Sequence, residues 1–335
     1  MSSSDNTASR RSLVGGTGLG LAAAAASAAP AMAQGTAQVA PAQPLQDPAK
    51  KFPSPPFQRQ TQPWPGLASR MEPRPDHGEK TYRGSGRLAG RRALVTGRDS
   101  GMGRAAAIAF AREGADVAIN YLPAEEEDAR EVIALIKEAG RNGVAIPGDL
   151  RDEAFCRSMV EQAVRALGGL DILVNNAARQ QQRQSILDVS SEDFDSTMKT
   201  NLYAPFWTIK AALPHLQPGS CIIGTTSEQA TDPSPDLYDY AQTKAATTNY
   251  VRSLAKQLAS KGIRVNGVAP GPIWTPLQVS GGATMEKLEK FGAQTPMGRP
   301  GQPGELGSIY VQLAAADASY ATGQVYGSAG GGGMP

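Results

Sequence analysis

Short apolar runs and amphipathic stretches alternate along residues 89–330. Runs at 93–95, 116–120, 143–147, 170–178, 220–224 and 263–268 have the length and composition of buried strands, and a last short strand begins at residue 324. The stretches between them have helical length and periodicity, at 101–114, 125–139, 153–167, 191–213 and 238–261. Such alternation predicts the α/β class, as a single domain with a Rossmann-type doubly wound parallel sheet of about seven strands and helices on both faces.

A glycine-rich turn joins the first predicted strand to the first helix. It contains Gly97, Gly101 and Gly103, in a Gly-x-x-x-Gly-x-Gly arrangement. Glycines here let the backbone approach a pyrophosphate, and the following helix N-terminus offers amide donors to an anion. Taken alone, an ordinary tight turn explains the glycines equally well. The position between strand and helix favours phosphate binding.

Tyr240 and Lys244 stand four residues apart in the predicted helix 238–261, so their side chains share one face. An ammonium near a phenol favours the phenolate and lowers the phenol pKa from its free value of about 10. A phenol tuned in this way can exchange protons with an alcohol or carbonyl near neutral pH. Alone, a Tyr-x-x-x-Lys pair is a weak signal, and the other motifs of the chain give it weight.

Together these motifs resemble those of the short-chain dehydrogenase/reductase family, over about residues 85–330. The resemblance rests on their order and spacing, including the position of Ser227 13 residues before Tyr240; the motif residues are Thr96, Gly97, Gly101, Gly103, Asp149, Asn175, Asn176, Ala177, Asn201, Ser227, Tyr240, Lys244, Pro270 and Gly271. Segments 71–79, 82–86, 99–101, 118–123 and 233–237 resemble a bacterial subgroup described as glucose/ribitol-dehydrogenase-like or aldehyde-reductase-like.

The resemblance implies a role for each matching residue. Tyr240 would be the general acid/base, Lys244 would bind the nicotinamide ribose and lower the Tyr240 pKa, Ser227 would hydrogen-bond the reacting oxygen, and Asn201 would hold a water that links Lys244 to solvent. The implied cofactor-binding set is Gly97, Arg98, Ser100, Gly101, Met102, Gly103, Asn120, Tyr121, Asp149, Leu150, Asn176, Ala177, Tyr240, Lys244, Pro270, Gly271, Ile273 and Thr275.

Some of these residues have a plain structural alternative. Asn201 could cap or bridge a helix, and Asp149 could be a turn residue. Trp274 suits a substrate pocket and simple packing equally. Tyr238 is a competing phenol, but its fourth neighbour is Gln242 rather than a lysine, so packing or a place at the substrate rim is expected.

The choice between NADP(H) and NAD(H) depends on charge at the end of the second predicted strand. A carboxylate there would hydrogen-bond the ribose hydroxyls and repel a 2′-phosphate. This sequence has Asn120 followed by Tyr121, and Arg98 is available to pair with a phosphate. NADP(H) is therefore preferred, and NAD(H) binding stays open if Arg98 points to solvent.

The two ends of the chain differ from the central domain. Residues 1–33 combine Arg10-Arg11, a mildly apolar stretch and Ala31-Met32-Ala33, which is typical of a twin-arginine export signal and predicts a periplasmic protein. A chance pair of arginines in an alanine-rich tail, in a cytoplasmic protein, is the alternative. Residues 34–88 are expected to form an extended arm, with ten of the 25 prolines lying between 34 and 75. Residues 331–335 are expected to be a flexible tail.

The subgroup resemblance favours an arm (52–88) that lies on a neighbouring subunit, within the homotetramer common in the family. The net charge of +2, without a basic run after the leader, predicts no nucleic-acid partner and no stable membrane association. Cys156 and Cys221 are expected to be small core residues. His77 and His215 are far apart and form no metal-ligand pattern.

These observations predict an NADP(H)-dependent oxidoreductase that interconverts a small carbonyl compound (an aldehyde, ketone or sugar) and its alcohol, with Tyr240 as acid/base. A 3-oxoacyl thioester reductase remains an alternative. A non-catalytic nucleotide-binding scaffold or redox sensor is a further one, although a pure binder needs no activated phenol. Residues 276–303 are expected to form a lid over a modest-sized substrate.

Overall fold

The computed structural model describes residues 45–97 and 100–333. The predicted export signal (1–33), residues 34–44 of the predicted arm, Arg98 in the glycine turn and the last two residues of the predicted tail lie outside this range. Within the described residues, no helix is long and apolar enough to cross a membrane.

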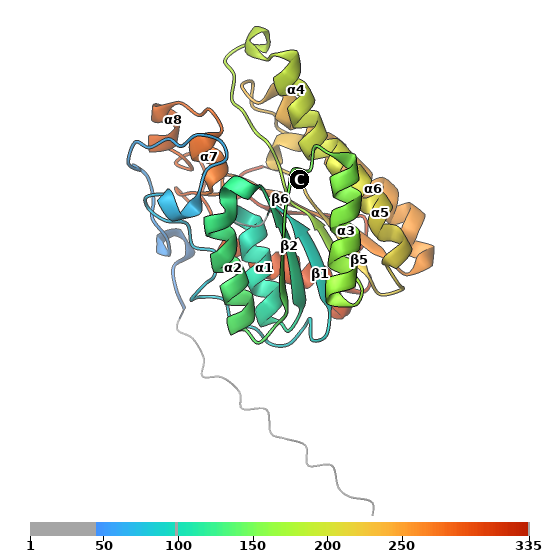
Figure 1. Ribbon diagram of the computed structural model, residues 1–335. Coiled ribbons are helices and arrows are strands. Elements are labelled where there is room, and N and C mark those ends of the chain that lie inside the picture. Colours follow the sequence, from blue (N-terminus) through green and yellow to red (C-terminus); the bar gives the residue numbers. More distant parts are fainter. Residues whose placement is uncertain (1–44, 98–99, 334–335) are drawn as a thin grey trace, which may run out of the picture. The chain divides into compact units, whose positions relative to one another are not determined.

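Seven parallel strands form one sheet with the order β3-β2-β1-β4-β5-β6-β7 (Figure 1). Their bounds are β1 Arg92–Thr96, β2 Asp116–Tyr121, β3 Gly143–Pro147, β4 Ile172–Asn175, β5 Cys221–Thr225, β6 Arg264–Pro270 and β7 Val325–Ser328. The order reverses between β1 and β4, which is where doubly wound sheets bind ligands, beyond the carboxyl ends of their strands. The predicted fold class is confirmed.

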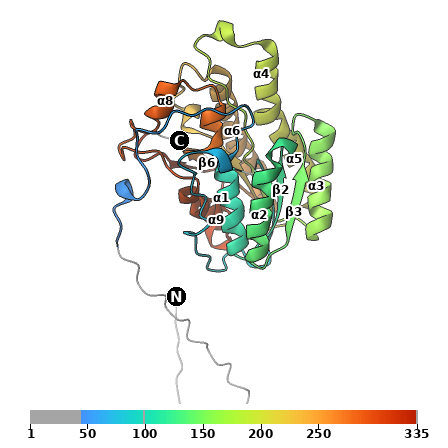
Figure 2. The same cartoon turned by 60° about the vertical axis from the view of Figure 1, so that its left-hand side comes forward.

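Alternation along each strand divides the apolar core into two layers. In β1, Ala93 and Val95 pack on one face of the sheet, and Leu94 packs on the other. One layer is covered by α1 (Gly101–Arg112), α2 (Glu126–Glu138) and α9 (Gly304–Ala314), and the other by α3 (Glu153–Leu167), α5 (Ala204–Ala212) and α6 (Tyr238–Leu258), as Figure 2 shows. Cys156 and Cys221 are free and buried in this core, as predicted.

The stretch 191–213 is interrupted where the sequence predicted one helix. α4 (Ser191–Met198) leads into a π-helical turn (Lys199–Tyr203) and then into α5. Pro205 has no backbone N–H, so the carbonyl of residue 201 cannot receive its regular helical bond, and the interruption falls there. The wider turn places Asn201 in the interior, only 3% exposed.

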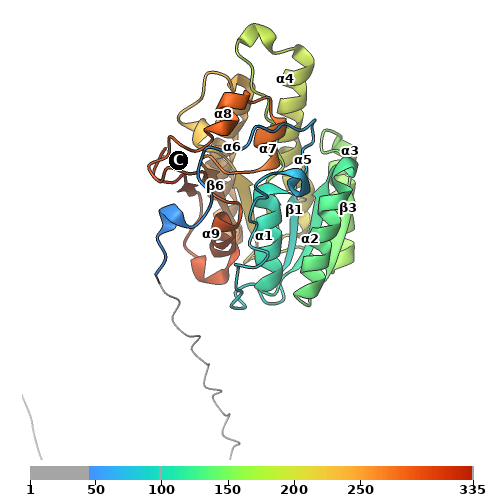
Figure 3. The same cartoon turned by 90° about the vertical axis from the view of Figure 1, so that its left-hand side faces the viewer.

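Residues 46–90, called the arm from this point on, pack on the chain's own domain. The subgroup resemblance favoured a position on a neighbouring subunit. The arm runs beside α7 (Pro276–Ser280) and α8 (Met285–Glu289), as Figure 3 shows. The backbone N–H of Phe57 donates to the Glu289 carbonyl at 2.9 Å, and that of Gln62 donates to the Val279 carbonyl at 3.0 Å. The segment contains two short 3-10 helices, Pro48–Lys50 and Ala68–Arg70, and these backbone bonds hold the extended chain between them against the domain.

Trp274 fixes the middle of the arm. Its ring is fully buried and stacks on Phe57 with 4.3 Å between centroids, and its indole N–H donates to the Pro73 carbonyl at 2.8 Å. Of the two interpretations left open for Trp274, the structure shows packing.

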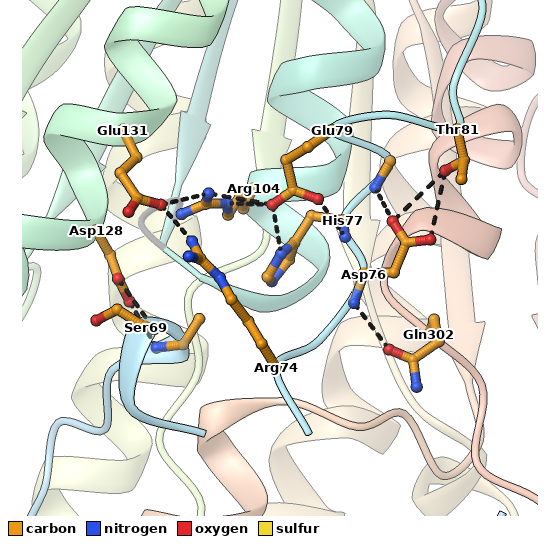
Figure 4. A network of polar contacts seen from close by, with 12 residues as sticks. Ser69, Arg74, Asp76, His77, Glu79, Thr81, Arg104, Asp128, Glu131 and Gln302 are labelled. Carbon is orange, nitrogen blue, oxygen red and sulfur yellow. Dashed lines mark hydrogen bonds and ion pairs between the residues drawn. The ribbon is translucent and has the colours of Figure 1, made fainter. Parts of the chain in front are cut away.

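A polar network ties the end of the arm to α1 and α2 (Figure 4). Arg104, 1% exposed, donates to Glu79 at 3.1 Å and to Glu131 at 2.8 Å, and Glu131 also pairs with Arg74. His77 is buried against Glu79, with 3.0 Å between its Nδ1 and the carboxylate. Burial lowers the pKa of His77, so the neutral ring is favoured.

Candidate active site

A cleft of about 220 Å³ opens at the carboxyl ends of β1, β2, β3 and β4. It brings together most of the residues predicted to bind a cofactor: Gly97, Ser100, Gly101, Met102, Asn120, Tyr121, Asp149, Leu150, Asn176, Ala177, Tyr240, Lys244 and Thr275. Arg98 belongs to the same turn but lies outside the described residues. The structure thus brings these residues together at one edge of the sheet, and their role in cofactor binding stays a prediction.

The glycine turn lets the backbone pass where side chains would not fit. A Cβ on Gly103 would lie 2.2 Å from the Gly97 carbonyl oxygen, and one on Gly97 would lie 2.6 Å from the Ala177 Cα. Gly101 has φ of +57° and begins α1, a 12-residue helix whose N-terminal amides face the cleft. This turn fits the pyrophosphate of a dinucleotide.

Asn120 ends β2 with its side chain engaged by the sheet. Its amide donates to the carbonyls of Ile146 at 3.2 Å and Gly148 at 3.1 Å, and only 2% of the residue is exposed. The Tyr121 hydroxyl donates to Glu126 at 2.5 Å, and burial together with this carboxylate raises the Tyr121 pKa. The position where a carboxylate would meet ribose hydroxyls is thus filled by a neutral, internally bonded amide.

Asp149 and Asn176 border the cleft, and their side chains form hydrogen bonds within the protein. Burial would raise the Asp149 pKa, but the hydrogen bonds from Arg151, as short as 2.6 Å, hold it below its usual value. Asn176 donates to the Gly97 carbonyl at 2.8 Å, which joins β4 to the glycine turn. The Asp149 carboxylate also accepts the backbone N–H of Arg151, two residues further on, at 2.9 Å. This is the bond expected of a turn residue, so that alternative for Asp149 is present in the structure.

A second cavity, about 670 Å³ in volume, adjoins the cleft. Pro270, Gly271 and Ile273, which were predicted to bind the cofactor, line this cavity, whereas Thr275 borders both spaces. Residues of the expected lid line this cavity, among them Lys287 of α8 and, directly after α8, Lys290 and Phe291. Ser227 contributes from the turn after β5, and its hydroxyl accepts the Gln229 N–H at 3.2 Å.

Tyr240 stands at the junction, since it lines both the cleft and the second cavity. Burial raises the pKa of its phenol to about 12, the adjacent Ser227 hydroxyl acts in the opposite direction, and the charge of Glu228 adds to the increase. The sequence predicted a lowered pKa. The direction is reversed because desolvation of the phenolate dominates in this structure.

Lys244 lies one helical turn further along α6 and is 3% exposed. Its Nζ donates to the Thr225 carbonyl oxygen at 2.8 Å and lies 5.3 Å from the Tyr240 ring centroid. Burial lowers its pKa to about 7, so the ammonium is only partly populated near neutral pH. This explains why Lys244 does little to lower the Tyr240 pKa here.

Asn201 is held by backbone and side-chain bonds at once. Its carbonyl oxygen accepts the Arg179 N–H at 2.7 Å, and its amide donates to the Arg179 carbonyl at 2.9 Å and to the Thr243 hydroxyl at 3.0 Å. The bridging alternative for Asn201 is therefore present in the structure. The same bonds fix the loop after β4 against α6 at Thr243, the residue before Lys244.

Sequence reasoning missed two contributors to these spaces. Trp64, Pro65 and Gly66 of the arm line the cofactor cleft, and the Trp64 ring centroid lies 5.9 Å from the Arg179 guanidinium. Glu228, directly after Ser227, lines the second cavity. A tryptophan between prolines in a polar arm, and a carboxylate next to the motif serine, are the signals that could have drawn attention to them.

Comparisons with known proteins agree with this geometry. A family model described as "Enoyl-(Acyl carrier protein) reductase" matches residues 97–332. The chain is 57% identical over 287 residues to the uncharacterized oxidoreductase YghA of Escherichia coli, covering 86% of this chain and 98% of that protein. It is 42% identical over 276 residues to a glucose and ribitol dehydrogenase of Daucus carota, covering 81% and 94%.

Solved structures also resemble this chain. A short-chain dehydrogenase of Burkholderia cenocepacia, crystallised in complex with NADP, superposes with a TM-score of 0.68 at 34% identity, over 73% of this chain and 98% of that one. Fold, site and relatives together define an oxidoreductase with a dinucleotide cleft. The chain belongs to the short-chain dehydrogenase/reductase family.

Proposed function

We propose that this protein is an NADP(H)-dependent oxidoreductase that interconverts a small carbonyl compound and its alcohol. The observation that carries the proposal is the position of Tyr240, whose side chain borders both the dinucleotide cleft and the second cavity. A bound nicotinamide would supply or accept the hydride. Each role given below to Tyr240, Ser227, Lys244 and Asn201 is part of the proposal.

In the reducing direction, Tyr240 donates its phenolic proton to the carbonyl oxygen as negative charge develops there. Ser227 donates a hydrogen bond to the same oxygen and stabilises that charge. Lys244 binds the ribose and, once an anion in the cleft restores its ammonium, stabilises the phenolate that proton transfer leaves behind. Asn201 positions the loop after β4 against α6. In oxidation the same groups act in reverse, with Tyr240 as the base.

The preference for NADP(H) is supported by three observations. The end of β2 presents the amide of Asn120 rather than a carboxylate, and the Burkholderia relative was crystallised with NADP. The nearby Glu125 carboxylate accepts the Leu122 N–H at 2.7 Å, which occupies it within its own turn. Arg98, in the glycine turn, is the residue we assign to the 2′-phosphate.

Steady-state reduction of short aldehydes with NADPH and with NADH tests this function. We expect turnover with NADPH at a higher kcat/KM than with NADH, and an Arg98→Ala variant should lose affinity for NADPH while its affinity for NADH stays within about twofold. Better binding of NADH by the wild type would overturn the cofactor choice. Turnover of an acetoacetyl thioester but of no free aldehyde would favour the thioester alternative instead.

Two further proposals concern the whole chain. Residues 1–33 would direct export, which fractionation of cells that produce wild type and an Arg10→Lys/Arg11→Lys variant tests: the wild type should reach the periplasm and the variant should not. The homotetramer is supported by the exposed side chains of Tyr203, at the end of the π-helical turn, and Phe206, at the start of α5, where a partner could cover them. Light scattering of the purified protein gives its mass directly, and a monomer would rule the tetramer out.

A further inference from the structure

Glu228 places a carboxylate inside the second cavity, in the turn that directly follows Ser227. It packs against glycine backbone: its Oε2 lies 3.0 Å from the position that a Cβ on Gly271 would take. The side chain therefore lies against the loop after β6, and its negative charge contributes to the raised pKa of Tyr240. This is an acid next to the reacting groups that the proposed proton transfer does not use.

The Glu228 carboxylate has no protein partner within residues 45–97 and 100–333, where no hydrogen bond or ion pair to it is formed. Burial and the nearby charge of Asp232 raise its pKa, which reflects the missing compensation. Of the two lysines that line the cavity, Lys287 pairs with Asp236, and neither forms an ion pair with Glu228 within the described residues. A partly buried carboxylate without a protein partner needs donors from water or from a ligand, and a ligand that displaces the water has to supply them.

The wall around Glu228 is unusually rich in carboxamides. Six glutamines line the cavity: Gln180, Gln182, Gln184, Gln229, Gln278 and Gln294. Gln180 is 5% exposed, and its side-chain amide makes no hydrogen bond to the described part of the chain. The buried Oε1 of Gln182 is likewise without a partner. Among the bonds formed within residues 45–97 and 100–333, the carboxamide of Gln229 is the one of these six that is held, by the Ser234 N–H at 2.6 Å.

These groups match a ligand that carries several hydroxyls. A hydroxyl donates to a carboxylate and both donates to and accepts from a carboxamide, so it can satisfy both kinds of unpaired group. A cationic ligand fits less well, because Lys287 and Lys290 line the same cavity. An unsubstituted alkyl chain would displace water from the glutamines and Glu228 without replacing its hydrogen bonds, which weakens binding.

We infer that Glu228 is a specificity-determining residue that accepts a hydrogen bond from a substrate hydroxyl close to the reacting carbon, so that the substrate is a hydroxylated carbonyl compound or the corresponding polyol. Gln180 contributes a second contact to the same ligand. This inference rests on the proposed function and narrows its substrate class. The preference for a hydroxylated substrate affects the stability of the transition state as well as substrate binding, because the hydroxyl is held beside the carbon that gains or loses the hydride.

The test compares D-glyceraldehyde with propanal, which have the same chain length and differ in two hydroxyls. The wild type should favour D-glyceraldehyde in kcat/KM, and Glu228→Leu should lower the ratio of the two values by about 10- to 100-fold, the range expected for a charged hydrogen bond. Glu228→Gln keeps an acceptor and should lose less. Asp232→Asn, an exposed neighbour outside the cavity, should leave the ratio unchanged.

A second readout separates this role from a structural one. With the Glu228 charge removed in Glu228→Gln, the Tyr240 pKa should fall, so the rise of kcat/KM with pH for alcohol oxidation should move to lower pH. Lys244 and Ser227, which also lie near the phenol, are unchanged in this variant. An unaltered substrate ratio in Glu228→Leu would overturn the inference, whichever way the pH profile moves.

The outcomes also distinguish failure of the inference from failure of the proposed function. If the wild type reduces both aldehydes equally well and every Glu228 variant keeps that ratio, the specificity role is wrong but the reductase stands. If neither aldehyde is reduced with NADPH or NADH, the proposed function itself fails. Propanal reduction by Glu228→Leu shows that the variant is folded, because the same active site must turn over.

Discussion

The Nζ atom of Lys244 lies 5.3 Å from the centre of the Tyr240 ring and donates its hydrogen bond to the Thr225 carbonyl. Burial moves the two pKa values apart, to about 12 for Tyr240 and about 7 for Lys244, and favours the neutral form of both. Negative charge in the cleft would favour the ammonium, and an ammonium would then favour the phenolate. Cofactor binding and proton transfer are coupled in this account.

The buried Lys244 should make the stability of the nucleotide-free protein depend on pH. The unfolded chain keeps this proton up to about pH 10.5, but the folded protein releases it near 7, so burial costs most below pH 7 and nothing above 10.5. Lys244→Met should therefore raise the free energy of unfolding, by a few kcal/mol at pH 6, since one pKa unit is worth about 1.4 kcal/mol. The gain should shrink steadily between pH 7 and 10.5.

Urea denaturation of wild type and Lys244→Met at several pH values measures this difference. Other titrating groups are shared by the two proteins, so their contributions cancel in the comparison. A stability difference that stays constant from pH 6 to 10 would show that Lys244 keeps its proton in the folded protein.

The fold could be predicted from the sequence because each strand and helix has its own periodicity. The short continuous apolar runs of the buried strands, and the glycine turn before α1, are local properties that the sequence contains. The π-helical turn at Lys199–Tyr203 was missed, because the Ser191–Leu213 stretch keeps helical periodicity through it. Only Pro205, read together with its missing N–H, indicates the interruption.

The candidate site was predictable where family motifs carry it and less so where long-range packing decides. The direction of the Tyr240 pKa shift depends on burial, which spacing along a helix cannot reveal. The position of the arm depends on contacts between Phe57 and Trp274, which are more than 200 residues apart. Glu228 became informative only when the cavity around it showed that its carboxylate has no protein partner.

Trp64 should contribute to cofactor affinity, because it borders the dinucleotide cleft and contacts the Arg179 guanidinium. Loss of this partly exposed ring in Trp64→Ala should weaken NADPH binding by roughly two- to fivefold, as expected for one exposed cation–π contact and its apolar area. Tyr320→Ala, which removes a fully exposed ring, is the matched control. Titration by NADPH fluorescence gives both constants, and equal values would remove the arm from the cofactor site.

Asp128 should anchor the arm to α2. Its buried carboxylate accepts the backbone N–H groups of Ala68 at 2.6 Å and Ser69 at 3.2 Å (Figure 4). Asp128→Ala leaves these donors unpaired and should lower the free energy of unfolding by about 1–3 kcal/mol, with faster proteolysis inside residues 57–76. The adjacent Glu127→Ala removes an exposed ion pair and should change stability by less than about 0.5 kcal/mol. Equal effects of the two variants would contradict the anchor.

The central claim is that Tyr240 transfers the proton during carbonyl reduction. Single-turnover oxidation of NADPH by an aldehyde, followed at 340 nm in Tyr240→Phe and Tyr238→Phe, tests it most directly. Tyr238 belongs to the same helix but is exposed, so its variant should react like the wild type. Tyr240→Phe should bind NADPH normally and react at least about 100-fold more slowly, the usual contribution of a general acid. A Tyr240→Phe rate within a factor of a few of the wild type would contradict the account.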